Sequence, residues 1–63
     1  MYEPQIGDLV TVISGPFVGT EGVVTEVFGT GPRAGVTIEY RTYGELVSLT
    51  FLAEEVAQIA VTA

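Results

Sequence analysis

The side chains able to do chemistry in this 63-residue chain are carboxylates, tyrosines and two arginines. The sequence contains no cysteine, no histidine and no lysine, which excludes thiolate and imidazole metal sites and the usual pairs of nucleophile and base. Its eight carboxylates are scattered without the spacing of a calcium-binding loop. Glu54 and Glu55 are adjacent, so they do not point at a common centre. We expect no catalytic activity, no metal site and no cofactor.

The charge of the chain restricts its partners. The formal net charge is −6, from the eight acidic residues against Arg33 and Arg41. Proteins bind nucleic acids mainly through Lys and Arg that neutralise phosphates, so this charge disfavours direct binding of DNA or RNA and, equally, of an anionic membrane surface. No apolar run has the length of a transmembrane helix, and no signal peptide opens the chain. We expect a soluble, cytoplasmic protein.

Glycines that could cradle a phosphate are better explained as turn residues. Gly15, Gly19 and Gly22 are not followed by the lysine that a Walker-type loop requires. The segment Gly29–Gly35 (GTGPRAG) lacks the third glycine and the long helix of a dinucleotide-binding fingerprint. We therefore expect Gly15 in a left-handed turn, and Gly19 and Gly22 where the chain bends beneath its neighbour.

The elements that position these residues are short strands. Val, Thr and Gly dominate the sequence, and turn residues recur about every eight to twelve positions. This spacing is typical of a small all-β sandwich or barrel. The expected order is strands 9–13, 22–28, 36–40 and 46–51, one 3₁₀ turn over 52–56, and a brief fifth strand around Ile59 and Val61 that pairs with the first. Irregular alternation in the second strand predicts a bulge at Thr25–Glu26. In the fourth strand, Val47, Leu49 and Phe51 should face the core.

Three short segments carry a resemblance to a known family. They are Gly7-Asp8-x-Val10-x-Val12, Gly15-Pro16-Phe17-x-Gly19 and Gly22-x-Val24. Together they resemble the KOW motif, and more closely the C-terminal KOW domain of NusG-type transcription elongation and antitermination factors. The resemblance implies an all-β fold, a small five-stranded SH3-like (KOW) barrel with one 3₁₀ turn before the last strand. We place the barrel at residues 7–61, with an N-terminal arm at 1–6 and a C-terminal tail at 62–63.

The resemblance also implies where a partner would dock. The family carries an aromatic residue followed by Gly-Arg at the tip after its third strand, and uses it to bind partner proteins. Here the segment Glu39–Glu45 (EYRTYGE) is longer and offers both Tyr40 and Tyr43, so the equivalent residue stays open. Tyr43, at the expected hairpin tip 41–45, is our candidate anchor, with a ring lying back over the open end of the barrel as the alternative. Tyr40 continues the Val36–Ile38 face and fits the core better.

Further candidates surround the tip. Arg41, near Tyr43 and Glu45, is either an interface anchor or half of an ordinary cross-strand ion pair, and we favour the ion pair. Val18, Phe28 and Leu46 would extend a patch with Tyr43 if they are contiguous with it. Phe17 is expected to plug the core under the first loop. The predicted protein-binding residues are therefore Tyr43, Tyr40, Arg41, Leu46, Phe28 and Val18.

The leading hypothesis is a non-catalytic KOW module that docks a ribosomal or transcription-associated protein through the hairpin tip and the adjacent edge strand. Three alternatives stay open: an SH3-like accessory subunit of an electron-transfer complex, an acidic mimic of nucleic acid that inhibits a basic enzyme, and an engineered barrel without a biological role. The open sheet edge is compatible with a monomer or a weak homodimer.

Overall fold

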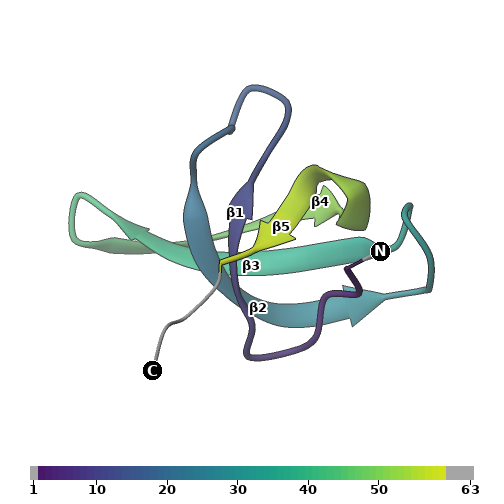
Figure 1. Ribbon diagram of the computed structural model, residues 1–63. Coiled ribbons are helices and arrows are strands. Elements are labelled where there is room, and N and C mark those ends of the chain that lie inside the picture. The colour runs from purple at the N-terminus through teal and green to yellow at the C-terminus, as the bar shows by residue number, and fades with distance from the viewer. Residues whose placement is uncertain (1, 60–63) are drawn as a thin grey trace.

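The computed structural model describes residues 2–59, in which five strands and one 3₁₀ turn follow one another. The elements are β1 (Leu9–Val12), β2 (Glu21–Phe28), β3 (Gly35–Thr42), β4 (Glu45–Leu52), the 3₁₀ turn η1 (Ala53–Glu55) and β5 (Val56–Gln58). They form one antiparallel sheet in the order β4-β3-β2-β1-β5, strongly curved as in an SH3-like barrel (Figure 1). The predicted fold class is confirmed. Within the described residues, no helix is long and apolar enough to cross a membrane.

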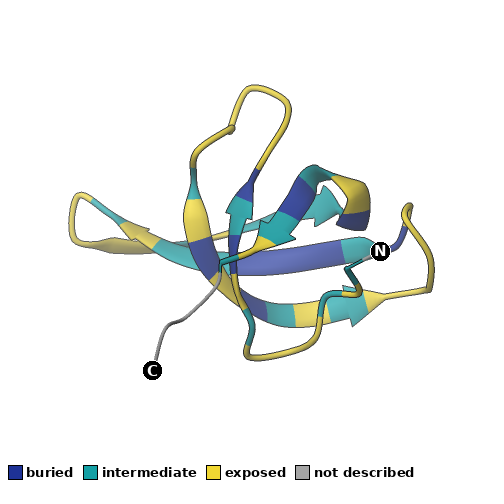
Figure 2. Ribbon diagram, viewed as in Figure 1, coloured by how far each residue is buried: buried dark blue, intermediate teal, exposed yellow. Residues whose placement is uncertain are grey.

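One face of the sheet forms the core. Val10 and Val12 of β1, Val24 of β2, and Val36 and Ile38 of β3 are almost completely buried. These residues are β-branched, and in β1 and β2 they alternate with more exposed neighbours, as expected for a sheet with one buried face (Figure 2). In β3, Thr37 between Val36 and Ile38 is buried as well. The small residues Ala34 and Ala53, together with Val56, complete the core beside η1.

β2 contains a bulge, which lets side chains on both sides of it pack against the core. Its pairing with β3 shifts register between Val24 and Glu26, so Thr25 is the extra residue. The shift lets Val24 lie in the core and Val27 pack against it, although they are three positions apart. The predicted bulge is confirmed, and it is the kind of bend that a small closed sheet needs.

The predicted roles of Gly15 and Gly22 are confirmed, whereas that of Gly19 is not. Gly19 has a φ of 94° and no atom beyond its chain neighbours within 4 Å of the position of a Cβ, so it is a turn residue and does not lie beneath a neighbouring segment. Gly15 has a φ of 88°, in the left-handed region that favours glycine. At Gly22 the reason is different: a Cβ atom there would lie 2.8 Å from the backbone oxygen of Glu39. β2 and β3 therefore approach each other more closely at this point than any side chain allows.

Several boundaries differ from those predicted. β3 and β4 extend farther towards their shared tip, because the turn between them uses only two residues, Tyr43 and Gly44. The inward side chains of β4 are half-buried, since β4 is an edge strand. β5 begins at Val56, directly after the three-residue η1, and pairs with β1 as expected. Val61 and the predicted tail 62–63 lie outside the described residues.

Phe17 departs from its predicted place as a core plug. Its side chain is half-exposed in the loop between β1 and β2. The ring packs edge-on against Phe51, with 5.8 Å between ring centroids and 75° between the planes. Phe17 therefore covers the rim of the core, because the loop that carries it stands away from the sheet (Figure 1).

Candidate functional site

The hairpin between β3 and β4 holds the strongest candidate residue. Thr42 pairs with Glu45, leaving Tyr43 and Gly44 as the two turn residues. Their φ angles are 50° and 80°, the pair of positive values that a type I′ turn requires. Tyr43 is the non-glycine residue with positive φ in the described part of the chain. Its side chain is fully exposed, so it does not lie back over the barrel.

The other tip residues divide between the two faces of the sheet. Residues paired directly across antiparallel strands project to the same side. Arg41 pairs with Leu46 on the outward face, while Tyr40 pairs with Val47 on the core side. Tyr40 packs against the core cluster, as predicted, and Leu46 is exposed. The structure thus brings Arg41 and Leu46 together on the outward face, one cross-strand pair away from the Tyr43–Gly44 turn.

The ion pair favoured for Arg41 is not formed. Among residues 2–59 the salt bridge present joins Arg33 to Glu54, at 3.9 Å between Nη1 and Oε1. The two-residue turn is the reason, because it sets Glu45 opposite Thr42 and places Leu46 opposite Arg41. Arg41 is therefore an exposed cation beside an exposed apolar side chain.

Phe28 and Val18 lie away from the tip. Phe28 pairs with Gly35, at the opposite end of β3 from Thr42, and strands rise about 3.3 Å per residue. Val18 follows Phe17 in the loop after β1, where its N–H donates to the backbone oxygen of Gly15 at 3.2 Å. Both side chains are exposed, but neither extends the Arg41–Leu46 pair.

β4 adds a free strand edge to the tip. It is the terminal strand of the sheet, and its eight residues pair with β3 along their whole length. The backbone groups on its other side have no strand beside them among the described residues. An edge of this kind can accept an additional extended segment through backbone hydrogen bonds.

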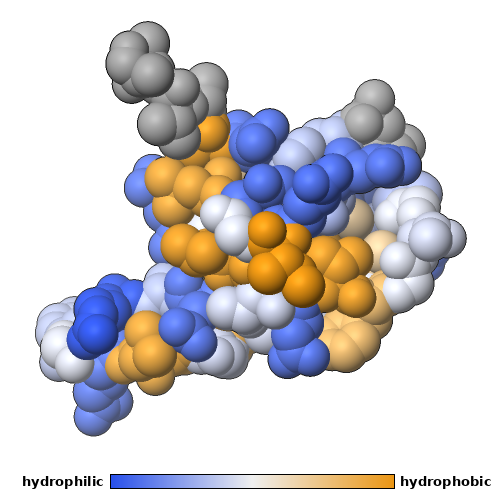
Figure 3. Space-filling view, turned by 90° about the horizontal axis from the view of Figure 1, so that it is seen from below, coloured by the Kyte–Doolittle hydropathy of each residue, from blue (hydrophilic) through white to orange (hydrophobic). Residues whose placement is uncertain are grey.

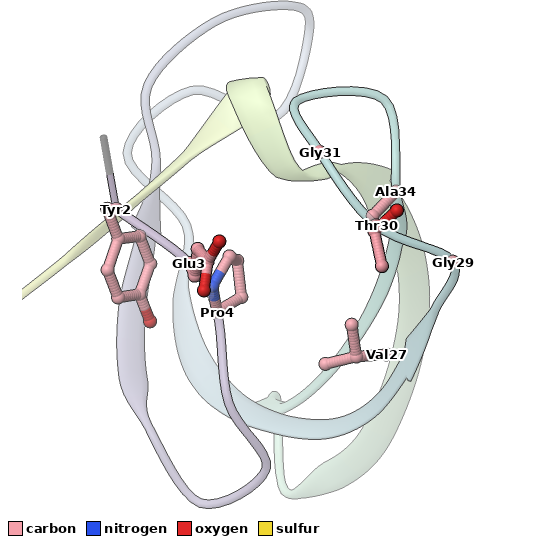
Figure 4. Close-up of a pocket in the computed structure, with 8 residues that line it drawn as sticks. All are labelled: Tyr2, Glu3, Pro4, Val27, Gly29, Thr30, Gly31 and Ala34. Carbon is pink, nitrogen blue, oxygen red and sulfur yellow. The ribbon is translucent and has the colours of Figure 1, made fainter.

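A hollow at the end of the barrel escaped the sequence reasoning. It has a volume of about 140 Å³ and lies between Tyr2, Glu3 and Pro4 on one side and residues of the β2–β3 connection on the other (Figure 4). Sequence patterns treated residues 1–6 as an arm and gave no sign that they approach the barrel. The available signal in the sequence was Tyr2, which can form a hydrogen bond to Asp8 six positions later.

Tyr2 anchors this N-terminal segment to Asp8. Its hydroxyl donates to Oδ2 of Asp8 at 2.6 Å, and the same oxygen accepts from the backbone N–H of Gln5 at 3.0 Å. Burial, followed by the hydrogen bond and the negative charge of Asp8, raises the pKa of the Tyr2 hydroxyl well above its usual value. Tyr2 therefore stays protonated as a hydrogen-bond donor.

The described surface carries acidic and aromatic side chains. In the described part of the chain, no three acidic side chains gather around a point that could hold a metal ion. The described surface offers the fully exposed ring of Tyr43, the partly exposed rings of Phe17 and Phe28, one free strand edge and a predominance of carboxylates.

Comparison with known proteins gives one match. The model of the KOW motif family matches residues 6–39, more than half of the chain. The matched part covers β1, β2 and most of β3, and ends before the tip at Tyr43. No curated protein and no solved structure matches the chain.

Proposed function

We propose that this chain, which belongs to the KOW motif family, is a non-catalytic docking module for a protein of the transcription or translation machinery. KOW motifs occur generally in small modules associated with proteins and RNA. The net charge of −6 favours a protein partner over a nucleic acid, because phosphate contacts need Lys and Arg. A ribosomal or transcription-associated partner would place the chain in the cytoplasm.

The observation that carries the proposal is Tyr43. It combines full exposure with a backbone conformation that a bulky side chain rarely adopts. Strained residues retained on a surface are frequently functional, and exposed tyrosines are frequent interface anchors. Tyr43 is followed by Gly44 at the tip, as the aromatic residue of the NusG-type domains is followed by glycine, although Glu45 stands where those domains have arginine. Tyr40, in contrast, packs against the core.

The docking surface we propose consists of Tyr43, the Arg41–Leu46 pair and the free edge of β4. Leu46 supplies apolar area next to the ring, and Arg41 can pair with a partner carboxylate. An extended segment of the partner would add to the sheet along β4.

Affinity capture from cell extract with the wild-type chain and with Tyr43→Ala tests the proposal. The wild type should retain a ribosomal or transcription-associated protein, and the variant should release it. Val18→Ala is a matched control, since Val18 is exposed but distant from the tip, and it should behave as the wild type. Capture of one basic nucleic-acid enzyme by all three proteins, lost on adding salt, would instead favour nucleic-acid mimicry.

A further inference from the structure

A row of apolar side chains crosses the outward face of β5, β1 and β2. Leu9 pairs with Val23. The register of β1 with β5 continues past Gln58, and the N–H of Ile59 donates to the backbone oxygen of Leu9 at 2.9 Å. Ile59, the residue after β5, therefore lies beside Leu9 of β1, and Leu9 lies beside Val23 of β2. Leu9 is 37% and Val23 42% exposed, and Figure 3 shows hydrophobic side chains gathered on the face seen from below.

Carboxylates adjoin this row. Glu39 pairs with Val23, so it lies next in line on β3. Glu21 and Glu26 project from β2 before and after Val23, and both are exposed. β1 and β5 carry no charged residue, and the only charged residues of β2 are Glu21 and Glu26. The face is therefore apolar along one row, with negative charge at one end of the row and on its flanks.

We propose that this outward face is a second docking surface, and that its occupant is a basic amphipathic helix of a partner protein. Charge complementarity carries the choice of partner. A second copy of this chain would bring another net charge of −6 against the same carboxylates, which opposes self-association. A segment with Lys or Arg beside its apolar residues would satisfy both parts of the face.

The spacing of the row favours a helix over an extended segment. Neighbouring strands lie about 4.8 Å apart, which is the separation of Ile59, Leu9 and Val23 along the row. One helical turn advances about 5.4 Å, so a helix crossing the strands can set one apolar residue against each of the three. Alternate residues of an extended chain are about 6.8 Å apart and lose this match. A lysine or arginine of the partner helix, one helical turn beyond the residue that contacts Val23, would reach Glu39.

The test is a titration of isotope-labelled protein, followed by NMR, with a synthetic helical peptide of about 15 residues. The peptide carries leucine once per turn on one face and lysine elsewhere. Backbone amide signals of β1, β2 and residues 56–59 should shift, and those of the β3–β4 tip should not. The double variant Leu9→Thr and Val23→Thr should weaken binding about fivefold or more, since it removes apolar contact without changing charge. Val18→Thr, an exposed valine elsewhere, should leave binding unchanged.

Three results would overturn the proposal. One is equal binding of a peptide with serine in place of leucine, because attraction would then be charge alone. Another is that Val18→Thr weakens peptide binding as much as the double variant does. The last is a shift of the same signals on raising protein concentration without peptide, which would identify a second copy as the occupant. Tyr43→Ala should not affect peptide binding, so this proposal and the proposed docking site at the hairpin tip are tested independently of each other.

Discussion

Tyr43 holds a conformation that its side chain does not favour and gains no contact in return. A bulky L-residue in the left-handed region costs on the order of 1–2 kcal/mol, whereas asparagine adopts this turn position readily. Tyr43→Asn should therefore raise the free energy of unfolding by about 1 kcal/mol while it removes the proposed anchor. Urea unfolding of the two proteins measures the difference.

Tyr43→Phe is the control for that measurement. It keeps the ring and the Cβ that cause the strain, so its free energy of unfolding should equal that of the wild type. A less stable Tyr43→Asn variant would mean that the ring packs on the protein in solution, and the argument from strain would be lost.

The sequence was sufficient to place Tyr43 at a tip, because the strand patterns on both sides of it converge there. The sequence was insufficient to predict which residue lies opposite Arg41. Whether Arg41 faces Glu45 or Leu46 depends on a turn of two residues rather than five, and a change in turn length alters every cross-strand pair. Tyr43 gave no local sign that it adopts positive φ, so the shorter turn was not predicted.

Among the elements, β2 and β3 are held at their close approach by Gly22. Gly22→Ala forces a Cβ to within 2.8 Å of the backbone oxygen of Glu39, and backbone cannot move aside as a side chain can. We expect a loss of about 1–3 kcal/mol in the free energy of unfolding, measurable by thermal or urea denaturation.

Gly35→Ala is the matched variant, because it also lies where β2 pairs with β3. A Cβ at Gly35 would meet Cδ2 of Phe28 at 3.4 Å, and that exposed ring can shift. Its effect should be small. If both alanines destabilise equally, the general cost of changing a glycine in this sheet explains the result and close approach does not.

The succession of strands along the chain and the bulge of β2 could be predicted, because alternation and turn residues are local signals. The extent of burial could not. Val47, Leu49 and Phe51 show the alternation of a core strand, yet they are half-buried because β4 lies at the edge of the sheet. Edge position arises from the whole topology and leaves no mark in the strand itself.

For the molecule as a whole, the Tyr2–Asp8 hydrogen bond joins the N-terminal segment to the barrel. Because folding raises the pKa of Tyr2, the unfolded chain loses this proton first as the pH rises. Above pH of about 10 the free energy of unfolding should therefore fall with pH, while at neutral pH the contribution is fully present.

Tyr2→Phe should reduce that alkaline decline, and urea unfolding from neutral pH to about pH 11 measures it in both proteins. The variant should also be less stable at neutral pH, since it leaves Asp8 without one of its two donors. Equal alkaline slopes in the two proteins would mean that the segment around Tyr2 does not hold its place at the barrel end.

The pairing of β1 with β5 also governs when this protein can acquire its structure. β1 lies near the start of the chain and β5 near its end, yet they are hydrogen-bonded neighbours. The β3–β4 hairpin can form locally within microseconds, but closing the sheet requires a contact that spans almost the whole sequence and proceeds much more slowly. During translation, Val10 and Val12 must therefore stay uncovered on one flank until Val56 has left the ribosome. The sheet should therefore close only after β5 has been synthesised.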